Sequence, residues 1–211
     1  NGGFFDAQLN PSSVFIDSVV VDNNFTFSSA SSSNYFKANG GAGATVFRVM
    51  GNFTLTNSGI LSGQGVYGNF GGNGNVEFYT GGVFTHTNGL FAAIYSNSPS
   101  TGNGNLNYTS SDAFIQNGGY HYGVNNTTSP NAGTPTFNYN SIQFNNGYYE
   151  AFKGGNISYA INNYTVTNNL AINFTAASNT FQINSVALVA SNSNTMGLNM
   201  TVGGSLTIAG A

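Results

Sequence analysis

The feature that most constrains the fold is a period-two alternation of apolar and polar residues, which recurs in short segments along the chain. Successive side chains of a β-strand point to opposite faces, so this alternation predicts strands with one buried face. Gly, Asn, Ser and Pro separate the segments, as is typical of turns. We therefore predict strands at residues 14–21, 24–28, 45–56, 76–80, 90–95, 106–109, 120–124, 136–144, 157–161, 164–174, 180–189, 198–202 and 206–208.

Many short strands with turn signals between them predict an all-β fold, an antiparallel β-sandwich of the immunoglobulin-like or pilin-like kind. Asn-Gly pairs favour tight turns, and several of the seven in this chain are expected to close hairpins. A parallel β-helix would also accept Gly and Asn at its corners. However, three Asn-Phe-Thr triplets start at residues 24, 52 and 173, which is no fixed repeat, so the sandwich is the predicted architecture. The Asn-Gly pairs begin at Asn1, Asn39, Asn73, Asn88, Asn103, Asn117 and Asn146.

A chain of 211 residues with 40% hydrophobic content can bury the core of one domain. We expect residues 1–13 to form an N-terminal strand and hinge, and residues 14–211 to form a single sandwich domain. Two Gly- and Ser-rich stretches, 28–33 and 63–75, are expected to be surface loops.

Charged residues make up only 4% of the chain, against roughly 25% in an ordinary soluble domain. Three Lys and Arg cannot form a basic patch, so neither nucleic acid nor an anionic membrane is an expected partner. The absence of Cys excludes disulfides and thiolate chemistry. Residues 14–21 are far shorter than the roughly 20 apolar residues that cross a bilayer, so membrane insertion of the mature chain is not expected. With six carboxylates, stability is expected to change little between about pH 2 and 7.

Few residues could carry catalysis. His86 and His121 lie in alternating segments and are expected to occupy ordinary strand positions, and no G-x-S-x-G or H-E-x-x-H motif accompanies them. Asp112, Glu77 and Glu150 could in principle supply the two carboxylates of a glycosidase, but no polar constellation surrounds them in the sequence. We expect no enzymatic activity, no metal and no cofactor.

N-x-[ST] sequons are the more informative pattern. Thr occupies the third position in eight of the nine, and the middle residue is often aromatic. On a strand, Leu106 and Tyr108 would then point inward while Asn107 faces solvent, and Asn173 is placed in the same way. Alternating Thr and aromatics are also simply good strand residues; we favour N-glycosylation, because glycans would keep a nearly uncharged surface soluble. The predicted sites are Asn24, Asn52, Asn107, Asn125, Asn126, Asn156, Asn163, Asn173 and Asn199.

The first thirteen residues contain a short amphipathic segment in which Phe5, Ala7 and Leu9 alternate with polar residues before Pro11. This segment is either the first strand of its own sandwich or a strand donated to a neighbouring copy, which would link copies head to tail. If it pairs within its own subunit, the other end of the chain, where Leu206 and Ile208 alternate after Gly203-Gly204, becomes the next candidate for the donated strand.

The Cys-free, sequon-rich body and the detached N-terminal strand resemble the subunits of archaeal thread filaments, and secondly the archaeal bundling pilins. These are surface filaments whose β-sandwich subunits are joined by donor strand complementation. The resemblance implies a donor role for Phe5, Ala7 and Leu9 and glycans at the nine Asn residues.

The sequence therefore predicts an extracellular, glycosylated filament subunit that polymerises with copies of itself and serves adhesion, cell contact or biofilm structure. Two alternatives stay open. One is a secreted carbohydrate-binding or adhesive tip module that uses Tyr120, Tyr122, Tyr148 and Tyr149 to stack on sugars. The other is a glycoside hydrolase.

Overall fold

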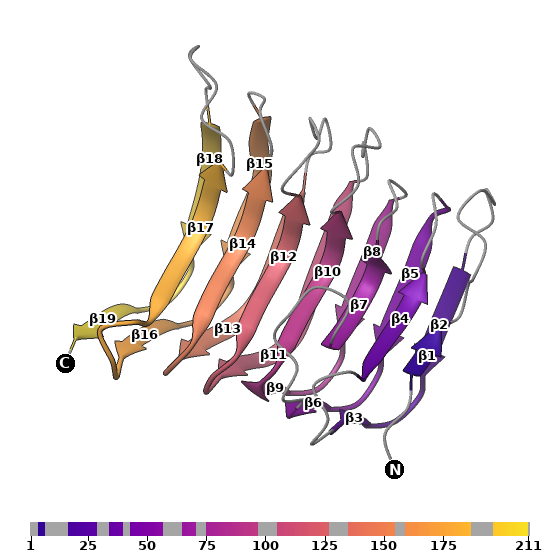
Figure 1. The fold of residues 1–211 in the computed structure, drawn as a ribbon. Helices are drawn as coiled ribbons and strands as arrows, with labels where there is room; N and C mark the ends of the chain where they lie inside the picture. The colour runs from indigo at the N-terminus through magenta and orange to yellow at the C-terminus, as the bar shows by residue number, and fades with distance from the viewer. Residues whose placement is uncertain are drawn as a thin grey trace.

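The computed structural model describes residues 4–6, 17–28, 34–39, 43–56, 65–70, 75–96, 105–126, 135–154, 159–186 and 196–210. Within these ranges the chain winds in successive coils that form two sheets (Figure 1). Each coil contributes one strand to a seven-stranded sheet. These strands are, in spatial order, β1 (Phe4–Asp6), β4 (Tyr35–Asn39), β7 (Gly65–Phe70), β10 (Leu90–Ser96), β12 (Tyr120–Asn126), β14 (Tyr148–Gly154) and β17 (Thr180–Val186).

The second sheet has twelve strands and is bent. Its long leg contains β2 (Asp17–Val21), β5 (Thr45–Val49), β8 (Val76–Thr80), β11 (Leu106–Gln116), β13 (Thr136–Phe144), β15 (Tyr159–Val166) and β18 (Met196–Val202). Its short leg contains β3 (Phe25–Phe27), β6 (Phe53–Thr56), β9 (Phe84–Asn88), β16 (Leu170–Phe174) and β19 (Leu206–Gly210), and the second halves of β11 and β13 lie between β9 and β16.

Every pairing between the described strands is parallel, so the fold is a β-solenoid. The predicted antiparallel β-sandwich is wrong, although the all-β class is right. A strand pairs with the equivalent strand of the next coil, as Phe25 does with Phe53 and Phe53 with Phe84, and not with the strand that follows it in sequence.

The donated N-terminal strand was part of the sandwich prediction and needs the same correction. Strand β1 pairs in parallel with β4 of the same chain, with Phe5 opposite Phe36. Residues 4–6 therefore form one edge of the seven-stranded sheet of their own chain, where an antiparallel sandwich with a detached strand was predicted. Ala7 and Leu9 lie outside the described residues.

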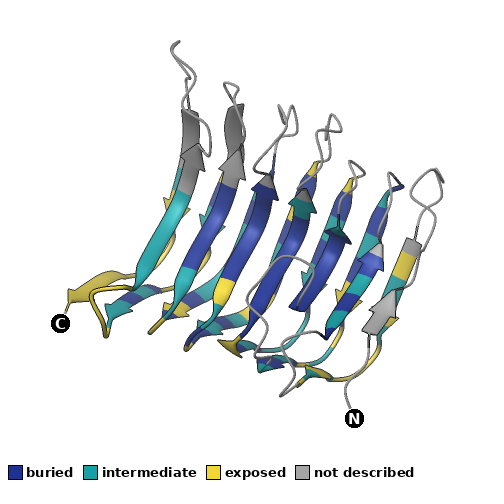
Figure 2. Ribbon diagram, in the orientation of Figure 1, coloured by how far each residue is buried: buried dark blue, intermediate teal, exposed yellow. Residues whose placement is uncertain are grey.

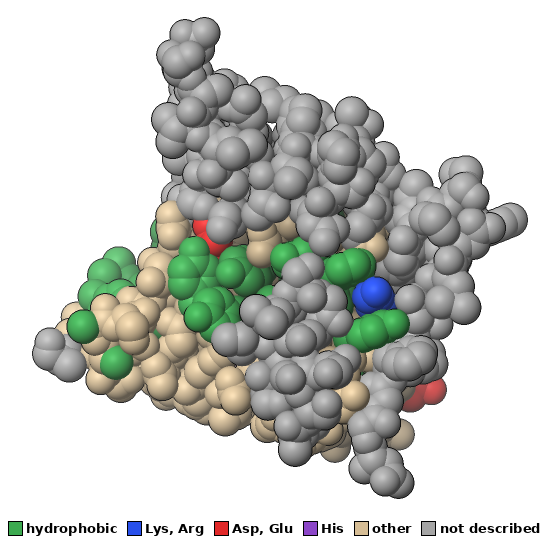
Figure 3. All heavy atoms as spheres, in the orientation of Figure 1, with side chains coloured by type: hydrophobic (Ala, Val, Ile, Leu, Met, Phe, Trp, Pro, Cys, Tyr) green, Lys and Arg blue, Asp and Glu red, His purple; other side chains and the backbone are tan. Residues whose placement is uncertain are grey.

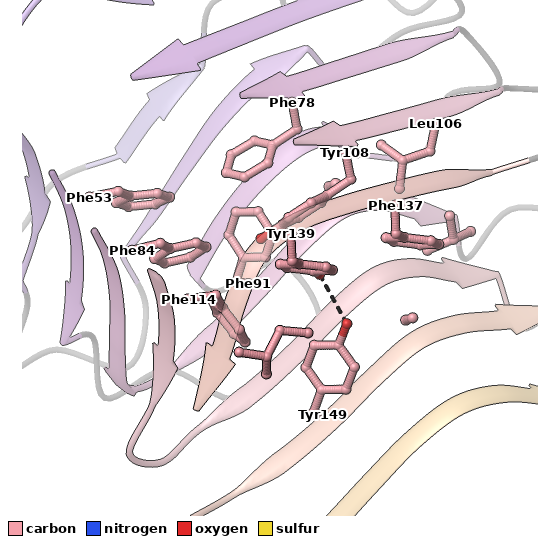
Figure 4. Packing of buried hydrophobic residues seen from close by; sticks show 14 of the residues in the cluster. Phe53, Phe78, Phe84, Phe91, Leu106, Tyr108, Phe114, Phe137, Tyr139 and Tyr149 are labelled. Carbon is pink, nitrogen blue, oxygen red and sulfur yellow. Dashed lines mark hydrogen bonds between the residues drawn. The ribbon is translucent and has the colours of Figure 1, made fainter. Parts of the chain in front are cut away.

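The core lies between the two sheets and consists of columns of equivalent residues (Figures 2 and 4). In the short leg, Phe25, Phe53, Phe84 and Phe114 occupy one column. Their neighbouring ring centroids are 5.1, 4.3 and 5.2 Å apart, and the rings of Phe53 and Phe84 stack with an interplanar angle of 9°. Parallel strands lie about 4.8 Å apart, so aromatic rings at one position of successive coils contact each other directly.

Glycines make the corner between the short leg and the seven-stranded sheet. Gly89, Gly119 and Gly147 have φ values of 91°, 75° and 102°, which side-chain-bearing residues rarely adopt. A Cβ at Gly119 would lie 2.5 Å from the carbonyl oxygen of Gly89, and one at Gly147 would lie 2.5 Å from that of Gly119. The Asn-Gly pairs at Asn88 and Asn146 therefore turn the coil at this corner, where hairpins between antiparallel strands were predicted.

Asparagine side chains join neighbouring coils at the bends. The backbone N–H of Asn52 donates to Asn24 Oδ1 (2.8 Å), and the N–H of Val83 donates to Asn52 Oδ1 (2.9 Å). At another bend, Asn145 Nδ2 donates to Asn117 Oδ1 (2.8 Å) and Asn173 Nδ2 donates to Asn145 Oδ1 (3.1 Å). Part of the high Asn content thus satisfies polar groups where the regular sheet hydrogen bonds stop.

Replacing Gly119 with Ala should destabilise the chain, because both its φ and its contact with Gly89 exclude a Cβ. We expect the free energy of unfolding to fall by about 1–3 kcal/mol, as measured by urea denaturation followed by circular dichroism. Gly210→Ala is the matched control, because a Cβ at Gly210 meets nothing within 4 Å. Equal losses in the two variants would contradict this account of the corner.

Candidate functional site

The two histidines lie inside the solenoid. His86 on β9 and His121 on β12 are both fully buried, and their ring centroids are 5.7 Å apart. His121 lies between Phe91 and Tyr149 of the neighbouring coils, with centroid distances of 4.7 and 5.3 Å and nearly parallel rings. Both histidines therefore occupy strand positions, as predicted, but they are members of the aromatic core.

Their surroundings keep both imidazoles neutral. His86 Nε2 lies 3.1 Å from the carbonyl oxygen of Gly89, and His121 Nε2 lies 3.4 Å from Tyr108 Oη. The Nδ1 atoms of both rings lack a hydrogen-bond partner among the described residues. Burial lowers the pKa of His86 from 6.5 to about 4, and burial together with the neighbouring His86 lowers the pKa of His121 well below its usual value.

Three buried tyrosines form a second group of polar atoms in the same core. Tyr149 Oη donates to Tyr139 Oη (2.9 Å), and the hydroxyls of Tyr149 and Tyr164 are 2.7 Å apart (Figure 4 draws the first of these bonds). Burial raises the pKa of Tyr149 and of Tyr164 well above the usual value, so both phenols are neutral at physiological pH. These hydroxyls and imidazoles are sealed inside the core, where they contribute to packing and cannot contact a substrate.

The candidate carboxylates are not brought together. Glu77 pairs with Arg48 on the twelve-stranded sheet, and Glu150 is buried beside Tyr148 of the seven-stranded sheet, whose hydroxyl donates to it (2.8 Å). Asp112 is exposed on β11. No contact joins any two of the three carboxylates in the described part of the chain, and no group of three or more His, Asp or Glu there could hold a metal ion.

Three of the four tyrosines considered for sugar binding lie on the outer face of the seven-stranded sheet, where hydrophobic side chains gather in Figure 3. Tyr120 and Tyr148 stack on each other with a centroid distance of 5.7 Å, and Tyr122 packs beside Tyr148. Tyr149, one residue after Tyr148, points to the opposite face and is fully buried in the core. It cannot contact a sugar.

The predicted glycosylation sites fall into different environments. Asn107 and Asn163 are exposed, as are Asn24 and Asn52, whose Oδ1 atoms hold the bends described above. Asn173 is half-buried and its amide donates to Asn145.

Of the remaining four sequons, one asparagine is buried. Asn125 is only 6% exposed, and its Oδ1 has no hydrogen-bond partner among the described residues. Asn156 and the side chains of Asn126 and Asn199 lie outside what the structure describes. Asn107 is exposed, in the outward orientation that the alternation predicted.

A groove of about 730 Å³ crosses the outer face of the twelve-stranded sheet at the beginning of β5, β8, β11 and β13. Its polar lining includes Asn75, Glu77, Asn105, Asn107, Thr136 and Asn138. Sequence analysis missed this groove, because its residues come from four strands that are each about one coil apart along the chain. Of its lining residues, sequence analysis had singled out only Asn107, as a sequon, and Glu77, as a candidate carboxylate.

The last described coil leaves part of the core uncovered. Leu206 and Ile208 on β19 continue the columns of Leu170 and Ile172, which are almost fully buried, but are themselves 56% and 64% exposed. They are among the few large apolar side chains that the described surface exposes to this extent.

Comparison with protein-family models, curated proteins and solved structures found no match for this chain. None of the described segments forms a helix of the length and hydrophobicity needed to span a bilayer.

The buried imidazoles change the expected response to pH. Because the folded-state pKa of His86 lies below 6.5, the unfolded chain binds a proton that the folded chain does not. The stability that depends on a neutral His86 is therefore fully present above about pH 6.5 and is lost as the pH falls toward about 4. This loss amounts to about 3 kcal/mol. His121 should add to this loss, since its pKa shifts in the same direction. Urea denaturation at a series of pH values measures this loss of unfolding free energy.

The double substitution His86→Phe and His121→Phe keeps aromatic rings in both columns and removes both titrating groups. The decisive quantity is the slope of unfolding free energy against pH, not its absolute value. That slope should flatten between pH 4 and 6.5 in the double variant; an unchanged slope would show that other groups cause the acid sensitivity.

Proposed function

We propose that this protein is a structural subunit of an extracellular filament in which copies of the chain stack end to end, without a catalytic role. The observation that carries the proposal is the uncovered edge of the core at Leu206 and Ile208. Burying the exposed parts of these two side chains, which are 56% and 64% exposed, would contribute roughly 1–2 kcal/mol each.

The opposite end of the described solenoid carries a matching surface. Phe25 and Phe27 on β3 belong to the same two columns as Leu206 and Ile208, and both are only partly buried. In the long leg, Val19 and Val21 at one end correspond in the same way to Met200 and Val202 at the other, and all four are partly buried. The first coil of one copy would therefore place apolar side chains over those of the last coil of another.

The backbone supports the same arrangement. β17, β18 and β19 are edge strands of the two sheets, so one side of each has backbone groups that no described strand pairs with. β1, β2 and β3 form the opposite edge. Pairing these edges would continue the parallel ladders from one copy into the next.

A contact between two different ends cannot close on itself when the copies stack along one axis, and it produces fibres. Solenoids also need a polar cap at each end to remain soluble as single particles. The proposal retains the glycosylated, extracellular homopolymer suggested by the sequence, with coil stacking in place of strand donation.

The test compares two variants of the same strand. Leu206→Asp with Ile208→Asp puts charge into the contact, whereas Thr207→Asp puts it on the exposed outer face between them. The wild-type chain and the Thr207→Asp variant should form uniform fibres in electron micrographs. The double variant should remain monomeric by light scattering and keep the β-sheet circular dichroism spectrum, because the replaced side chains are exposed in the single copy.

Fibres formed by the double variant would show that another surface mediates assembly. A wild-type chain that stays monomeric at high concentration would refute the filament itself.

A further inference from the structure

We propose that the groove on the outer face of the twelve-stranded sheet binds a neutral oligosaccharide. This binding site is separate from the ends of the solenoid and does not depend on filament formation.

The groove offers amide and hydroxyl groups that are free to bind a ligand. Asn107 is exposed, and Asn138 and Thr136 are partly exposed. The side chains of these three residues make no hydrogen bond to any other described residue. A carboxamide has both donors and acceptors, which suits sugar hydroxyls, because each hydroxyl can also donate and accept.

Glu77 adds an oriented acceptor. Arg48 Nε donates to Glu77 Oε1 (2.8 Å), and Arg48 Nη2 contacts the same oxygen. Both contacts fall on Oε1, so Oε2 keeps its capacity to accept hydrogen bonds from a ligand. Arg48 balances the charge of Glu77, and the groove lining contains no Lys or Arg. A neutral sugar therefore fits this surface better than an anionic one.

The dimensions suit a short stretch of a sugar chain. A volume of about 730 Å³ falls within the range typical of ligand sites. Four neighbouring parallel strands span about 14 Å, because their spacing is about 4.8 Å. A pyranose unit is about as long as one strand spacing, so two or three units would extend across β5, β8, β11 and β13.

An aromatic side chain lies beside the groove. Tyr79 and Met50, with Arg48 and Glu77, line an adjoining hollow of about 290 Å³, and Glu77 belongs to both. A partly exposed tyrosine ring can pack against the apolar face of a sugar. On the seven-stranded sheet, by contrast, Tyr120 and Tyr148 stack on each other, and the Tyr148 hydroxyl is already bonded to Glu150.

The sugar could come from two sources with the same chemistry. Asn107 lies in an Asn-Tyr-Thr sequon, so a glycan attached to Asn107 would start inside the groove. Alternatively, the groove would bind a separate polysaccharide.

The experiment uses the full chain made in a bacterial host without glycosylation, carrying Leu206→Asp and Ile208→Asp to prevent stacking. Cellohexaose, mannohexaose, xylohexaose and chitohexaose are titrated by calorimetry. At least one should bind, and Asn138→Ala and Glu77→Gln should each weaken that binding by about tenfold, as expected for the loss of a hydrogen bond of about 1.4 kcal/mol. Gln143→Ala is the matched control, because this exposed residue lies on β13 beyond the bend, outside the groove.

Protein from the native source distinguishes the two sources of sugar. If the Asn107 glycan fills the groove, the native protein should bind the added hexasaccharide only after enzymatic removal of its glycans; if it does not, binding should be the same before and after. The proposal is overturned if none of the four sugars binds the unglycosylated chain, or if Asn138→Ala and Glu77→Gln bind as well as Gln143→Ala.

Discussion

Everything in this structure depends on the parallel pairing of each coil with the next. That pairing places equivalent residues about 4.8 Å apart along the axis, so the residues at each position form a column. The place of a column in the coil decides which type of residue fits it. Columns inside the core contain aromatic rings that stack, such as Phe53 on Phe84. Columns at the corners contain glycines, such as Gly119, which leave room for the carbonyl group of the neighbouring coil. Columns at the bends contain asparagines such as Asn52, whose side-chain amide accepts a hydrogen bond from the backbone of the adjacent coil. In the last described coil, Leu206 has a described partner on one side only, Leu170, and is 56% exposed.

The sequence predicted the strands better than their partners. The predicted segments 76–80 and 136–144 coincide with β8 (Val76–Thr80) and β13 (Thr136–Phe144). The alternation favoured an antiparallel sheet, because parallel strands are usually buried on both faces. Here a parallel strand such as β8 is buried on one face only, and side chains alternate between the faces of any strand, so the pattern did not reveal the strand direction. The repeat was hidden because coil length varies: Phe25 pairs with Phe53, 28 residues on, and Phe53 pairs with Phe84, 31 residues on. The Asn-Phe-Thr triplets at residues 24 and 52 are one coil apart, whereas the one at 173 occupies a different position in its coil.

The polar interior and the groove show where sequence reasoning reaches its limit. His86 follows Phe84 by two residues, so the alternation already placed both on the buried face; its neighbour His121 comes from the other sheet, and that contact needs the fold. The groove is similar, since Glu77 and Asn138 are 61 residues apart in sequence and line one surface only because the coils stack. The proposed sugar-binding groove lies on the outer face of the twelve-stranded sheet, whereas the proposed stacking surfaces lie at the two ends of the described solenoid.

The most direct test of parallel stacking is a disulfide between two adjacent coils. Thr54 and Thr85 are register partners on the outer face of the short leg, and the chain has no cysteine of its own. Parallel neighbours have Cα atoms about 4.8 Å apart, within the range that a disulfide spans, whereas positions two coils apart are about 10 Å from each other. Thr54→Cys with Thr85→Cys should therefore form an intramolecular disulfide on mild oxidation, and Thr54→Cys with Ile115→Cys should not. Failure of the first pair, or equal crosslinking of both pairs, would contradict the stacked solenoid.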